Sequence, residues 1–123
     1  MLDLAKGVTV IIRMGDVAPF DFGGLEIRDY TAGEPVSSSF ALISVPPGAV
    51  HPEAMSLRSD KYYFVVSGSV EFVDEGEVCV LAAGDFCLVS QGRRFSYRNV
   101  SDEPAALSLV HTPSFEAEAE VFV

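Results

Sequence analysis

Short runs of apolar, β-branched and aromatic residues, separated by glycine, proline, aspartate and serine, constrain the fold of this chain more than any other feature. They occupy residues 8–14, 25–30, 37–45, 61–73, 77–82, 85–90, 95–100 and 106–112. In none of them do apolar residues recur with the spacing of an amphipathic helix. Strand-like runs at this spacing, with turn residues between them, predict an all-β protein, either a sandwich or a barrel.

The residue types indicate where the turns between these runs lie. Gly76 lies in the segment 73–77 and can adopt the positive φ that a hairpin turn requires. The Pro-Pro-Gly segment 46–48 ends a strand, because proline cannot donate a hydrogen bond to a β-ladder. In the C-terminal segment 116–123, acidic residues alternate with alanine before an apolar end. We expect this segment to form a short helical turn or an edge strand against a partner subunit.

Length and charge limit the classes of function. A chain of 123 residues suits one domain, spanning residues 1–123. The net charge of −10 would repel a phosphate backbone, so we expect no nucleic-acid partner. No apolar run reaches the roughly 20 residues that a membrane-spanning helix needs, and the first residues carry no signal-peptide pattern. We therefore expect a cytoplasmic protein with no membrane partner.

The basic residues and the cysteines are few. Five basic residues fall in two groups, with Arg58 and Lys61 in the first and Arg93, Arg94 and Arg98 in the second. They either converge on a local positive site or are scattered solubilising charge. Cys79 and Cys87 lie in strand-like runs, and we expect them to be buried free thiols.

From residue 46 onwards, turns and strands follow one another in a distinctive order. The segments are, in chain order, PPGA, YYFVVSG, DEGE, AAGD, GRRF and NVSDEPA. This order resembles that of a small single-domain cupin, and the resemblance covers about residues 35–115. It implies a double-stranded β-helix, or jelly-roll barrel. The N-terminal strands and the C-terminal tail would then pack on the barrel or on a partner subunit.

The cupin family carries two metal-binding motifs, and here the resemblance extends only to their scaffold positions. These positions are kept at Gly48, Gly68, Gly84, Gly92 and Asn99. The four positions that would bind the metal are occupied by Ala54, Ser56, Lys61 and Phe95. Two of these residues have no donor atom, and a lysine brings positive charge into a cationic site. We therefore expect no metal cofactor at the family's position.

Strand alternation predicts what fills the barrel instead. If Lys61 points inward as the family glutamate would, Tyr63 points inward too. Phe95 and Tyr97 share an inward face by the same reasoning, with Ser56 nearby. We expect these residues to bind a small molecule. Lys61 would pair there with an anionic ligand, act as a base or Schiff-base amine, or replace the metal's charge and pair with a carboxylate such as Glu53.

A shifted site is the alternative. His51, Glu53 and His111 make a two-histidine, one-carboxylate set of the kind that binds divalent metals. In the competing interpretation, His51 is a turn residue in solvent, and His111 lies at the end of the barrel with its hydrogen bonds satisfied. Some sugar-nucleotide epimerases of the cupin superfamily, which this barrel resembles, use a histidine base and a tyrosine acid without a metal.

These observations leave three classes of function. The leading interpretation is a metal-less cupin that binds a small ligand, anionic or sugar-like, in the barrel. The first alternative is an isomerase or lyase with a non-standard metal or acid–base site. The second is a non-catalytic dimeric scaffold. Outward-facing Tyr62 and Phe64, together with the apolar end 121–123, predict a homodimer in any of the three cases.

Overall fold

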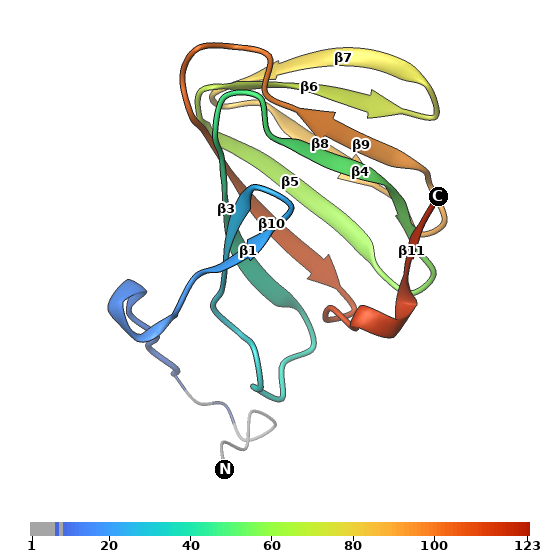
Figure 1. Cartoon of the computed structure of the whole chain (residues 1–123). Coiled ribbons are helices and arrows are strands. Elements are labelled where there is room, and N and C mark those ends of the chain that lie inside the picture. The colour runs from blue at the N-terminus through green and yellow to red at the C-terminus, as the bar shows by residue number, and fades with distance from the viewer. Residues whose placement is uncertain (1–6, 8) are drawn as a thin grey trace.

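The computed structural model describes residue 7 and residues 9–123, which form two antiparallel sheets (Figure 1). One sheet has six strands in the order β1-β2-β3-β10-β5-β8, and the other has five in the order β11-β4-β9-β6-β7. The strands span Phe20–Phe22 (β1), Leu25–Asp29 (β2), Ser39–Val45 (β3), Val50–Ser56 (β4), Asp60–Ser67 (β5), Ser69–Asp74 (β6), Glu77–Ala82 (β7), Phe86–Val89 (β8), Phe95–Arg98 (β9), Ala105–Thr112 (β10) and Glu120–Phe122 (β11). Two single-turn 3₁₀ helices, Met14–Asp16 (η2) and Ala117–Ala119 (η3), complete the described elements. The all-β prediction is confirmed.

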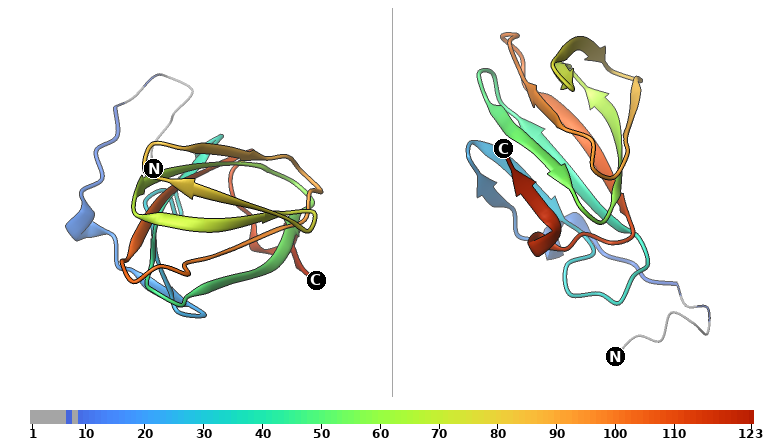
Figure 2. Two further views of the ribbon diagram at one scale, coloured as in Figure 1. Left: turned by 90° about the horizontal axis from the view of Figure 1, so that it is seen from above. Right: turned by 90° about the vertical axis from the view of Figure 1, so that its right-hand side faces the viewer.

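The two sheets enclose a common interior, which is clearest from above (Figure 2). Alternation along the strands fills it. On β10 every second residue is buried, from Ala105 through to His111, and on β5 the buried residues are Lys61, Tyr63 and Val65. Aliphatic side chains fill one end of the interior, whereas the other end receives Lys61 and His111. We call the end that holds Lys61 and His111 the polar end of the barrel and the opposite end the apolar end.

Gly68 makes the tight turn between β5 and β6. Its φ is +73°, and a Cβ atom there would lie 2.6 Å from the backbone oxygen of Pro104. Only glycine fits such a backbone and such a close approach. The run 61–73 therefore forms two strands, β5 and β6, which pair with different neighbours.

Asn99, at one of the family's scaffold positions, ties together loops at the apolar end of the barrel. Its buried side-chain amide donates to the carbonyl oxygens of Val45, at 2.9 Å, and Glu103, at 2.7 Å. Its oxygen accepts from the backbone N–H of Ser101 at 2.9 Å. These partners are the last residue of β3 and two residues of the loop between β9 and β10. Asn99 therefore supports the fold, and it lies away from the polar end of the barrel.

The strand prediction is wrong at three places in the N-terminal half of the chain: residues 9–13, β1 and β4. Residues 9–13 of the predicted strand 8–14 have no regular structure, and residue 8 lies outside the described part of the chain. Ile11 is 70% exposed there, and this run pairs with no strand of either sheet. Conversely, β4 was not predicted, since it contains Pro52. The register shift between His51 and Ala54, a β-bulge, accommodates this proline.

The C-terminal segment forms both of the elements expected for it, η3 and then β11. Strand β11 pairs with β4 of the same chain, which makes it the edge of the five-stranded sheet. The expectation of buried thiols is wrong for Cys79, which is exposed on β7. Cys87 is half-buried, and neither cysteine is in a disulfide. No helix in the described residues is long and apolar enough to cross a membrane.

Candidate ligand-binding site

A cavity of about 220 Å³ lies at the polar end of the barrel. Its apolar walls include Phe20, Phe22, Ile43, Leu109, Phe115 and Phe122, and its polar groups include His51, Lys61, Tyr63, Tyr97, His111 and Glu120. Two of the lining residues, Phe20 and Phe122, are 50% and 54% exposed, so the cavity reaches the surface. Its volume equals that of about seven water molecules and is smaller than a drug-sized pocket, so it suits a small ligand.

Strand register brings the polar groups together. His111 on β10 is the direct partner of Lys61 on β5. His51 on β4 is the partner of Tyr97 on β9, and their rings stack at 4.9 Å between centroids. Because β5 and β10 belong to one sheet and β4 and β9 to the other, both sheets contribute to one site.

Lys61 is buried, with 3% of its surface exposed, and it forms an ion pair with Glu120 of β11. Its ammonium also lies 5.0 Å from the centroid of the Phe95 ring, within cation–π range. Burial lowers the pKa of Lys61, and the carboxylate of Glu120 opposes that shift. The ion pair therefore keeps a positive charge inside the barrel, as one of our sequence alternatives required, but with Glu120 as its partner and not Glu53.

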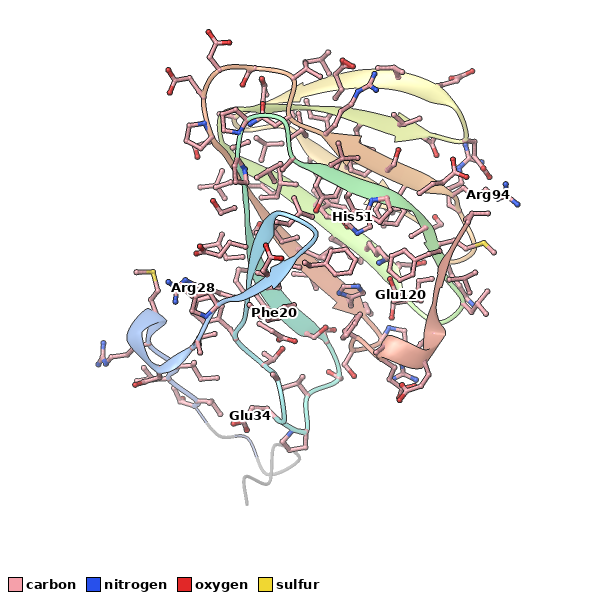
Figure 3. The ribbon with its side chains drawn as sticks, viewed as in Figure 1. Phe20, Arg28, Glu34, His51, Arg94 and Glu120 are labelled. Atoms are coloured by element: carbon pink, nitrogen blue, oxygen red, sulfur yellow. The ribbon has the colours of Figure 1, made fainter. Side chains whose placement is uncertain are left out.

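His51 is held in one tautomer. Its Nδ1 lies 2.7 Å from the carbonyl oxygen of Pro52, which can only accept, so Nδ1 carries the proton. Burial lowers the pKa of His51 to about 4, and the charge of Lys61 adds to the shift. The imidazole is therefore neutral at pH 7, and its Nε2 is free of hydrogen bonds to the described residues. His51 and Glu120 both line the cavity and are labelled in Figure 3.

Two buried polar atoms of the cavity have no hydrogen-bond partner among the described residues: the hydroxyl of Tyr97 and Nε2 of His111. Burial raises the pKa of both Tyr97 and Tyr63, so both phenols stay protonated. Burial lowers the pKa of His111 to about 3, with a further contribution from Lys61. Unsatisfied buried polar groups cost about 1–3 kcal/mol each, so two in one cavity indicate a place for a polar ligand or water.

Not every residue expected at the site lines the cavity. Lys61, Tyr63 and Tyr97 do. Phe95 is 1% exposed and packs against the rings of His51, at 5.1 Å, and Tyr63, at 5.9 Å, so it supports the site from within the core. Ser56 Oγ accepts from the backbone N–H of Ser59 at 2.9 Å and so shapes the turn after β4.

The arginines do not form a positive site. Arg93 pairs with Asp74 at 2.8 Å and Arg98 with Glu71 at 3.0 Å. The two others near the barrel end also have acidic partners, since Arg58 lies 3.6 Å from Glu116 and Arg94 lies 3.9 Å from Glu53. These arginines are therefore scattered charges, each with an acidic partner, and they do not converge on one positive site.

The residues present do not fit a metal ion of the kind that the family binds. Among the described residues no group of three or more histidine, cysteine or acidic side chains is placed to hold one. Glu53 is directed to Arg94, which lies outside the barrel, so it does not join His51 and His111 (Figure 3). The charge of Lys61 also lowers the pKa of both histidines, and it would repel a cation bound between them.

Sequence reasoning missed the residues that arrive from the two ends of the chain. Glu120 and Phe122 come from β11, and Phe20 and Phe22 from β1, a strand that was not predicted. The available signal was the alternation in the C-terminal tail, which places Glu120 and Phe122 on the same face of a strand.

Comparison with known proteins identifies the family. The family described as cupin domain matches residues 41–111. A nucleoside dehydratase, Pac13, superimposes with a TM-score of 0.81 at 24% identity, covering 94% of this chain and 92% of that one. A substituted form of Streptomyces PAC13 with uridine gives a TM-score of 0.82, also at 24% identity, with the same coverage of 94% and 92%. A predicted oxalate decarboxylase from Thermotoga maritima gives 0.76 at 18% identity, covering 85% and 99%. These likenesses show the jelly-roll barrel.

One curated protein also matches in sequence. Endoribonuclease YbeY of Myxococcus xanthus is 29% identical over 116 residues, which is 92% of this chain. The chain spans 39% of the length of that protein.

Proposed function

The chain belongs to the cupin family, and we propose that its barrel binds a small nucleoside-like or sugar-like molecule at the polar end, without a metal. The observation that carries this proposal is the pair of unpartnered buried atoms, Tyr97 hydroxyl and His111 Nε2, in an otherwise aromatic cavity. Aromatic walls stack on the face of a ring, and the few polar groups fix its orientation. The barrel's likeness to a uridine-bound structure suggests uridine as the first probe.

Binding is best measured by calorimetric titration of uridine, with thermal unfolding as a second readout. We expect uridine to raise the unfolding temperature and Tyr97→Phe to weaken its binding by about tenfold, the loss of one good hydrogen bond. Tyr62→Phe is the matched control, because Tyr62 is not among the residues lining the cavity. Equal losses in both variants, or no binding of uridine, ribose or related sugars, would argue against the proposal.

A second candidate function, a lyase, is favoured by the state of His51. Its neutral imidazole exposes a free Nε2 lone pair beside two protonated phenols. Such a histidine can take a proton from a carbon next to a carbonyl and return it to a departing hydroxyl, so that the substrate loses water. The phenols of Tyr63 and Tyr97 would donate hydrogen bonds to the developing oxyanion, since their raised pKa values keep them protonated.

Proton NMR in D₂O tests this lyase reading. Carbonyl-bearing nucleosides and sugars are incubated with the protein, and loss of water or exchange of a carbon-bound proton is followed. We expect His51→Gln to abolish exchange while retaining ligand binding. Exchange that survives this substitution would exclude His51 as the base. Metal content, measured by mass spectrometry on untagged protein, separates this route from a metal enzyme: about one bound equivalent would revive a site at His51 and His111.

We also propose a homodimer and no nucleic-acid partner. Phe64 on β5 and Phe86 on β8 are direct cross-strand partners, and both are exposed on the outer face of the six-stranded sheet. Such an apolar stripe suits a two-fold contact. Nucleic acid is disfavoured by the net charge of −10 and by the pairing of the arginines with carboxylates. Light scattering behind a sizing column tests the oligomeric state.

A further inference from the structure

We propose that Glu120 makes the cavity selective against anionic ligands, so that the cavity accepts an uncharged nucleoside or sugar and rejects its phosphorylated or carboxylated form. This inference rests on the proposed function of the cavity as a ligand site. It argues against one of the three alternatives that the sequence left open for Lys61, pairing with an anionic ligand. Glu120 is thus a specificity-determining residue, and it acts by occupying the ammonium group that an anion would need.

The charges around the cavity support this assignment. Among the described residues that line it, Lys61 is positive, Glu120 and Asp29 are negative, and the two histidines are neutral at pH 7. The sum is one negative charge, within a chain whose net charge is −10. No arginine lines the cavity. An entering phosphate therefore meets a negative cavity with no free cation among the described residues.

An anion cannot take over Lys61 without a penalty. The side chain of Glu120 is only 10% exposed, so a carboxylate separated from Lys61 would remain buried and unpaired. Leaving one member of a buried ion pair without its partner is strongly unfavourable. If the anion shared Lys61 with Glu120 instead, two negative charges would be buried against one positive charge.

Glu120 is held in place by the sheet and does not depend on a flexible tail. On either side of it, the backbone N–H of Leu57 donates to the carbonyl of Ala119 at 2.8 Å, and the N–H of Val123 donates to the carbonyl of Glu53 at 3.0 Å. Phe122, on the same face of β11, packs 5.8 Å from the ring of Phe22 across the cavity. The carboxylate therefore has little freedom to swing away from Lys61.

Thermal unfolding and calorimetric titration of the full chain test the inference with three probes: uridine, uridine 5′-monophosphate and inorganic phosphate. For the wild-type protein we expect the monophosphate to bind at least about tenfold more weakly than uridine, and phosphate to leave the unfolding temperature unchanged. For Glu120→Gln we expect stabilisation by phosphate and at least about tenfold tighter binding of the monophosphate than in the wild type. Uridine, which carries no charge, is the reference probe for each variant.

Two control variants show whether the response to phosphate depends on Glu120 and Lys61. Glu118→Gln removes an equal charge from an exposed position on η3 and should behave as the wild type. The double variant Lys61→Gln/Glu120→Gln should lose the response to phosphate, because that response requires the freed ammonium. The inference is overturned if the wild type binds the monophosphate as tightly as uridine, or if folded Glu120→Gln does not respond to phosphate. If uridine does not bind but phosphate behaves as expected, the result contradicts only the proposal that the ligand is a nucleoside. Should Glu120→Gln not fold, the wild-type comparison still decides.

Discussion

Replacing Phe95 with alanine tests whether the core beneath the cavity is packed as the structure describes. Phe95 lies on β9 and is 1% exposed. Its ring packs against Phe72 at 5.8 Å, Tyr63 at 5.9 Å and His51 at 5.1 Å. Truncating a fully buried phenylalanine costs about 3–5 kcal/mol, because burial is lost and a cavity is left behind. Rings on several sides cannot all relax into the space, so we expect about 4 kcal/mol here.

A loss of this size is large enough to measure by thermal unfolding and by urea titration. Unfolding entropy of about 2.1 cal/mol/K per residue gives about 0.26 kcal/mol/K for 123 residues. A loss of about 4 kcal/mol then lowers the unfolding temperature by about 15 °C. Urea titration followed by circular dichroism measures the free energy of unfolding directly, and thermal unfolding checks it independently.

Val80→Ala is the control, because Val80 is 65% exposed on β7 and lies in neither the cavity nor the proposed dimer contact. Its replacement should change the free energy of unfolding by no more than about 0.5 kcal/mol. A loss below about 1 kcal/mol for Phe95→Ala would refute the packing around β9, and with it the account of how His51 and Lys61 are supported.

Three further outcomes are expected. Tyr97→Phe should leave the free energy of unfolding unchanged or raise it by about 1 kcal/mol, because it removes a buried hydroxyl without a partner; urea titration measures this. His51 and His111 have folded pKa values lowered to about 4 and 3, so the unfolded chain binds more protons below pH 6.5. Stability should fall as pH drops from 6.5 towards 4, by up to about 1.4 kcal/mol per pH unit for each histidine, and His51→Gln should reduce that slope in denaturation curves between pH 7 and 5. Gly68→Ala should cost at least about 2 kcal/mol, since its Cβ would clash with the carbonyl of Pro104 at a positive φ; a loss below about 0.5 kcal/mol would contradict the turn.

The fold was predictable because its information is local. Alternation correctly placed Lys61 and Tyr63 on the inner face of β5, and the turn residues marked most strand ends. Strand propensity failed for residues 9–13, since a strand also needs an edge to pair with, and that requirement is not local. The failure to predict β4 has the same origin, because it too depends on how strands pair. Pro52 reads as a strand breaker until the bulge beside it is known.

The site was less predictable than the fold because its partners are distant in sequence. The ion pair of Lys61 joins residues 59 apart, and it exists only because β11 pairs with β4. From sequence alone Glu53 was the natural partner, since it is nearer in the chain. The structure instead directs Glu53 outward to Arg94 at the bulge that follows His51.

The replacements at the family's ligand positions depend on one another physically. Lys61 places a cation inside the barrel, which Glu120 must compensate because a lone buried charge is unfavourable. Phe95 fills adjacent space with a ring whose face lies 5.0 Å from that ammonium. Restoring a histidine at Ala54 or Phe95 alone would therefore leave a positive charge where a metal ion would bind. A metal site would require changing Lys61 as well, and Glu120 would then need a new partner. The polar end of the barrel is therefore a coupled arrangement, in which the charge of Lys61, its partner Glu120 and the ring of Phe95 depend on one another.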